Sequence, residues 1–132
     1  MVLAPVKDTF RAVAVTVVPE ASALDAGGWS VLEDLVEAQL ARRPRAMQRQ
    51  LIVFIRAIEN LPRLRWGRPF TALSSRERTR VLAALEHAPV LLLRRGFWGL
   101  RTLAFLGYYA RPEAAAAIGY RADPRGWEAR RA

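Results

Sequence analysis

The apolar segment of residues 90–110 limits the possible folds of this chain more than any other stretch. Its length is close to the ~20 residues that a helix needs to cross a bilayer. However, Arg94, Arg95 and Arg101 lie inside it, and each charged side chain near the bilayer centre costs roughly 2.5–3.5 kcal/mol. The segment also contains glycines that let neighbouring elements approach closely, namely Gly96, Gly99 and Gly107. We therefore expect a central core helix rather than a membrane span.

Apolar residues at helical spacing predict three helices in the first sixty residues. Phe10, Val13 and Val17 share one face, and Pro19 ends that helix because the residue before a proline avoids helical backbone angles. Two further stripes flank Pro44, which ends the second helix or begins the third. The stripes consist of Leu32, Leu35, Val36 and Leu40, and of Met47, Leu51, Phe54, Ile55 and Ile58.

Two Ser-x-x-Glu patterns predict helix starts, because the two side chains can satisfy each other's free backbone amides. Ser30 with Glu33 would open the second helix, and Ser74 with Glu77 would open the fourth. The apolar face of the fourth helix contains Val81, Leu82 and Leu85, and Pro89 limits it. The proline- and glycine-containing stretches between the helices are predicted to be loops, at residues 21–28 and 60–70.

The segment after residue 110 predicts a short sixth helix followed by an extended tail. Pro112 is well placed as a first helical residue and Gly119 as the residue just past the end. Residues 121–132 contain a proline, a glycine and four arginines, and we expect them to be extended. The sequence thus predicts an all-α fold in one domain, residues 1–132, as a compact bundle of about five helices with a short sixth and a basic tail.

Residue types that commonly carry catalysis or bind metals are scarce. The chain has no cysteine, which excludes disulfides, thiolate nucleophiles and Cys-ligated metals. Its single histidine, His87, does not supply the several ligands of a His-based metal site, and the helix dipole favours a histidine at a helix end. Nucleophile-elbow, phosphate-loop and dinucleotide patterns are also missing. We therefore expect no catalytic, cofactor-binding or metal-binding residues in this chain.

The net charge of +9 is concentrated in the second half of the chain. Residues 1–60 hold seven basic and seven acidic side chains, whereas residues 61–132 hold fourteen and five. All the basic residues except Lys7 are arginines, which form fixed bidentate contacts with carboxylates and phosphates better than lysines do. The basic half indicates nucleic acid, anionic lipid or an acidic protein face as its partner, or a solvated arginine-rich surface.

Aromatic residues accompany the arginines of this half, as they do on nucleic-acid-binding surfaces and in protein interfaces. Phe97, Phe105 and one of the paired tyrosines share a helix face and are equally consistent with a core. The second half shows no helix-turn-helix, RNA-binding or zinc-finger pattern that would support nucleic-acid binding. Tyr120 and Trp127 follow the last predicted helix, and this position favours a partner surface.

Three stretches, in this order, resemble the family typified by gluconate 2-dehydrogenase subunit 3. They are "FRAVAVTVVPE" (10–20), "FTALSSRERTRVLAALEHAP" (70–89) and "FWGLRTLAFLGYYARPEAAAAIGY" (97–120). The third is the most specific, because it combines a large apolar helix, Gly-Tyr-aromatic, a proline-started turn and Gly-Tyr. The resemblance covers most of residues 10–127.

The resemblance implies an accessory subunit without a cofactor of its own. Its partner would be a large FAD-dependent oxidoreductase of the glucose–methanol–choline type, which oxidises an alcohol or sugar hydroxyl and needs the small subunit for folding or export. A cytochrome c subunit often receives the electrons. Many members carry a twin-arginine signal, and none precedes Phe10 here. We therefore expect a cytoplasmic complex, or a periplasmic one if the partner carries the export signal.

Within this interpretation, residues 106–121 would form a docking surface. Gly107 would let the long helix pack closely near its end, and the alanines between Pro112 and Gly119 would allow close approach to a flat surface. The candidate interface residues are Tyr108, Tyr109, Arg111, Tyr120, Arg121 and Trp127. The alternative is a small basic helical protein that binds nucleic acid or an anionic membrane surface.

Overall fold

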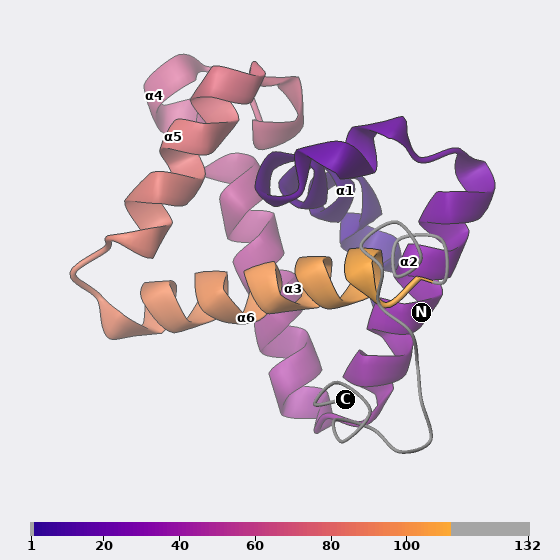
Figure 1. Ribbon diagram of the computed structural model, residues 1–132. Helices are drawn as coiled ribbons and strands as arrows, with labels where there is room; N and C mark the ends of the chain where they lie inside the picture. The colour runs from indigo at the N-terminus through magenta and orange to yellow at the C-terminus, as the bar shows by residue number, and fades with distance from the viewer. Residues whose placement is uncertain (1, 112–132) are drawn as a thin grey trace, which may run out of the picture.

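The computed structural model describes residues 2–111 and shows an all-α protein (Figure 1). Its long helices are α1 (Lys7–Val17), α2 (Ala26–Ala41), α3 (Arg45–Asn60), α5 (Ser75–Glu86) and α6 (Leu91–Tyr109). The shorter elements are η1 (Ala4–Val6), η2 (Pro19–Ala23), α4 (Arg63–Trp66) and η3 (Phe70–Ala72). No strand occurs within residues 2–111, so the predicted fold class is confirmed. The helix predicted at 112–119 and the tail predicted at 121–132 lie outside the described residues.

The helix α6 packs against α1, α2 and α5 and crosses α3 (Figure 1). Its inward stripe contains Phe97, Leu100, Ala104 and Gly107, whose spacing places them on one helix face. The core is completed by buried side chains of the other elements, among them Phe10, Val13, Leu32, Val36, Ile55, Ile58 and Phe70. The prediction of a helix over residues 90–110 is therefore confirmed.

The predicted start of the second helix is wrong. The helix α2 begins at Ala26, and the side chain of Asp25 caps it by accepting a hydrogen bond from the backbone N–H of Gly28 at 2.7 Å. Ser30 and Glu33 consequently lie inside the helix. Glu33 is buried and pairs with Arg11 of α1 instead of closing a capping box. The competing cap at Asp25 lies a little more than one turn earlier and therefore sets the helix start.

The other predicted boundaries agree with the structure. The helix α1 ends at Val17 before Pro19, which opens η2, and Pro44 is the N-cap of α3. The capping box of α5 is complete. The Ser74 hydroxyl accepts from the Glu77 backbone N–H at 3.2 Å, and the Glu77 carboxylate accepts from the Ser74 backbone N–H at 3.0 Å.

The two predicted loops contain short helical elements. Residues 21–28 include the end of η2 and the first turn of α2, and residues 60–70 include α4 and the start of η3. Gly67 ends α4 with a φ of 69°, a left-handed conformation that glycine adopts without steric cost. Phe70 is fully buried, and it anchors the segment between α4 and α5 to the core.

Candidate docking surface

The second half of α6 carries a ladder of aromatic and arginine side chains. The Arg101 guanidinium carbon lies 5.1 Å from the ring centroid of Trp98 and 5.0 Å from that of Phe105. Further along the helix, the Phe105 and Tyr109 rings stack at 5.8 Å between centroids. Because each contact spans one helical turn, the sequence spacing aligns these side chains along one flank of α6. Cation–π contacts of this kind hold the exposed aromatic rings in fixed orientations.

The predicted interface residues that the structure describes lie together at the end of α6. Tyr108 and Tyr109 are half-buried, and their rings meet edge to face at 4.9 Å between centroids. Arg111 is buried, and its guanidinium lies 4.5 Å from the Tyr108 ring while its Nε donates to the Tyr108 carbonyl at 3.1 Å. Tyr120, Arg121 and Trp127 lie outside the described residues. Their role in an interface, like that of the tyrosine pair, stays a prediction.

The first turns of α6 form an exposed apolar surface that the sequence interpretation missed. Phe97 is buried as expected, but the side chains before it are not covered. The exposed fractions are 53% for Val90, 50% for Leu91, 77% for Leu92, 38% for Leu93 and 50% for Trp98. In Figure 1 these turns extend to the left of α3, on the side away from α2. We call residues 90–98 the α6 tip.

The sequence did carry a signal for this surface. The tip contains four consecutive apolar residues, Val90 to Leu93, and these point in all directions around a helix. A helix that lies on the side of a bundle can turn only one of its faces to the core. Some of the four side chains therefore had to be exposed or covered by another molecule.

The α6 tip touches α3 through Gly96. A Cβ atom added at Gly96 would lie 2.7 Å from the nearest carbon of the Phe54 ring, so the ring packs directly on the helix backbone. Phe54 is itself half-buried. The apolar surface of the tip therefore continues onto α3.

Three carboxylates of the described residues, those of Glu33, Glu37 and Glu59, join elements inside the fold. Glu33 accepts two hydrogen bonds from Arg11, at 2.7 Å from Nη2 and 3.2 Å from Nε. These hydrogen bonds are the main cause of the raised pKa of Arg11. The carboxylate of Glu37 accepts the backbone N–H groups of residues 2 and 3, and that of Glu59 accepts from Thr9 and Thr71. These side chains stabilise contacts between elements rather than balance surface charge.

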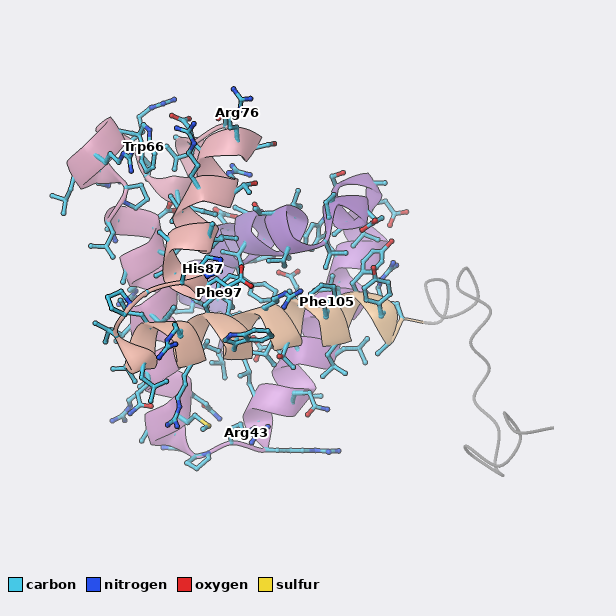
Figure 2. The ribbon with its side chains drawn as sticks, turned by 60° about the vertical axis from the view of Figure 1, so that its left-hand side comes forward. Arg43, Trp66, Arg76, His87, Phe97 and Phe105 are labelled. Atoms are coloured by element: carbon cyan, nitrogen blue, oxygen red, sulfur yellow. The ribbon has the colours of Figure 1, made fainter. Side chains whose placement is uncertain are left out.

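Arginines dominate the surface that remains. Within residues 2–111 the ion pairs are Arg11–Glu33 and Arg68–Glu77. Most other arginines are exposed, and Figure 2 shows Arg43 and Arg76 pointing away from the bundle. No acidic residue occurs between Glu86 and Glu113, a stretch that contains all of α6. The outer surface of α6 is therefore apolar and positively charged.

The described part of the chain shows no arrangement typical of a metal centre. Residues 2–111 contain no group of three or more His, Cys, Asp or Glu side chains that could hold a metal ion. His87 is exposed at the C-cap of α5 (Figure 2). No helix in this part is long and apolar enough to span a membrane.

The comparisons with known proteins identify one family. The model of the family described as gluconate 2-dehydrogenase subunit 3 matches residues 6–127. A comparison with curated proteins found no match, and a comparison with solved structures found none either. The match includes all the α-helices that the structure describes.

Proposed function

Because the chain belongs to the gluconate 2-dehydrogenase subunit 3 family, we propose that it is a non-catalytic small subunit of an oxidoreductase complex. In this proposal it binds an FAD-dependent large subunit of the glucose–methanol–choline type, which oxidises an alcohol or a sugar. Binding stabilises or matures that large subunit. The FAD belongs to the partner, and a cytochrome c subunit would accept the electrons. In this proposal the complex is cytoplasmic or periplasmic.

The uncovered apolar surface of α6 is the observation that carries this proposal. Monomeric proteins rarely expose a contiguous group of large apolar side chains, and such groups mark binding sites. Val90 to Leu93 and Trp98 form such a group beside Arg94 and Arg95, which make no ion pair within residues 2–111. Aromatic, apolar and arginine side chains together are the composition of protein interface centres.

Production of the large subunit with and without this chain tests the proposal. We expect the large subunit alone to be less soluble and to contain less flavin per protein than the co-produced form. Bound flavin is measured by absorbance after gel filtration, and dehydrogenase activity is measured with an artificial electron acceptor. Equal yield, flavin content and activity in the absence of the chain would contradict the proposed role.

The second candidate function is binding of nucleic acid or an anionic membrane. It is supported by four exposed arginines, Arg42 and Arg43 between α2 and α3 and Arg45 and Arg49 in the first turns of α3. If the leading proposal holds, affinity for duplex DNA is only non-specific, at about 10⁻⁴–10⁻⁶ M at physiological salt. Nanomolar, sequence-selective binding at that salt would favour the second candidate.

A further inference from the structure

The inward stripe of α6 continues past the edge of the bundle. Leu93 lies four residues before Phe97, so the two share one helix face, and Val90 is the N-cap residue just before α6. Phe97 is 3% exposed, whereas Leu93 is 38% and Val90 is 53% exposed. The same face is thus buried over the second half of α6 and uncovered over the tip. Within the tip, Leu93 and Val90 are therefore only partly covered by the described chain.

Trp98 enlarges this uncovered surface and is held in place. Half of its side chain is exposed, and Arg101 packs on its ring at 5.1 Å from the centroid. Tryptophan is among the residues that most often dominate the affinity of an interface. Leu92, at 77% exposure, projects furthest into solvent of the apolar side chains in the tip.

Positive charge surrounds the tip. Arg94 and Arg95 are exposed and have no carboxylate partner among the described residues. A surface that covers the tip must therefore offer an apolar hollow for the leucines and Trp98 and carboxylates at the rim for the two guanidinium groups. Arginine suits such fixed contacts with carboxylates.

Resting on the function proposed above, we infer that the α6 tip, residues 90–98, is the anchor that inserts into an apolar, carboxylate-rimmed hollow of the FAD-dependent large subunit. The charge of the chain argues for this occupant. A second copy of the chain also carries a net charge of +9, and like charges brought together at an interface cost free energy. A partner with acidic groups gains free energy from the same arginines.

The inference is tested by matched leucine substitutions. Leu92→Glu places a charge in the proposed contact, whereas Leu64→Glu makes the same change on α4, where Leu64 is 87% exposed. Affinity for the purified FAD-dependent large subunit is measured by calorimetry. We expect Leu92→Glu to weaken binding at least about thirtyfold and Leu64→Glu to leave it within about twofold. Trp98→Ala should also weaken binding about thirtyfold.

Melting temperatures of the isolated variants distinguish a loss of binding from a loss of folding. We expect Leu92→Glu to melt at the wild-type temperature, because the described chain does not cover this side chain. A large drop would instead show that the rest of the chain covers the tip, and it would overturn the inference. Replacement of both Arg94 and Arg95 by Glu should slow association and reverse its salt dependence.

The outcomes separate this inference from the proposed function. Wild-type chain that fails to bind the large subunit would overturn both. Binding that persists unchanged in Leu92→Glu and Trp98→Ala would overturn only the assignment of the tip. Light scattering of the free chain and sedimentation with phosphatidylglycerol vesicles complete the test. Self-association or vesicle binding that Leu92→Glu abolishes, with large-subunit affinity intact, would assign the tip to a second copy or to a membrane.

Discussion

Replacing Gly96, Gly99 or Gly107 of α6 by alanine measures how closely neighbouring elements pack against the helix at each position. In a helix interior, this change gains about 0.5–1 kcal/mol where space is free. Gly99 is such a place, because a Cβ atom there would meet nothing within 4 Å. At Gly107 the added Cβ would lie 2.8 Å from Val36 Cγ2 and 3.1 Å from two carbons of Leu32.

The magnitude at Gly107 follows from the stiffness of its neighbours. Val36 and Leu32 are fully buried, and the branched Val36 side chain has little rotational freedom. Overpacking in a dense core costs about 1–3 kcal/mol. Since the gain in helix propensity is nearly common to both variants, Gly107→Ala should be less stable than Gly99→Ala by that amount. Gly96→Ala should fall between them, because it meets the half-buried Phe54 ring, which can move.

Thermal unfolding followed by circular dichroism at 222 nm provides the assay. For a domain of this size, about 1 kcal/mol shifts the melting temperature by about 4 °C. We therefore expect Gly107→Ala to melt about 4–12 °C below Gly99→Ala. Equal melting temperatures for the two variants would refute the close contact between α2 and α6.

Three further substitutions test local features. The pKa of Glu77 lies below its ordinary value of 4.5, chiefly because the carboxylate accepts the Ser74 backbone N–H; its stabilising effect is therefore present above pH 4.5 and lost as the pH falls below it. Glu77→Gln should retain the capping box but reduce the loss of unfolding free energy below pH 4.5, measured by urea unfolding at several pH values. An unchanged dependence of the unfolding free energy on pH would contradict the assignment. Glu33→Ala should cost about 1–2 kcal/mol, reduced because Arg11 is about a third exposed, while the exposed neighbour variant Asp34→Ala should stay within about 0.5 kcal/mol in the same assay. Tyr109→Ala, if the tyrosine pair contacts the partner, should weaken large-subunit binding with little change in melting temperature, and a lower melting temperature with unchanged binding would place it in the core.

Local sequence patterns predicted most of the helix boundaries but could not resolve competition between two caps. Ser74–Glu77 and Ser30–Glu33 are the same pattern, yet only the first forms a capping box. The second loses to Asp25, which caps the helix more than one turn earlier, and Glu33 instead pairs with Arg11 on another helix. That contact joins residues 22 positions apart, and a reading of local spacing cannot reveal it.

The docking surface was predicted only in part for a similar reason. The sequence indicates that residues 90–110 are apolar and helical, and the structure agrees. Where the bundle ends along α6 depends on the crossing with α3 at Gly96, which is a property of the packed fold. The aromatic and arginine residues from Trp98 to Tyr109 meet because their spacing of three or four residues brings them into contact on any helix, and their role in an interface stays a prediction.

In the proposed function, this chain binds an FAD-dependent large subunit. The most direct measurement of this binding is the mass of the species formed when the two purified proteins are mixed, determined by light scattering during size-exclusion chromatography. We expect one peak that carries flavin absorbance and exceeds the large subunit in mass by at least one copy of the 132-residue chain. Two separate peaks at the masses of the free proteins, at concentrations well above micromolar, would contradict it.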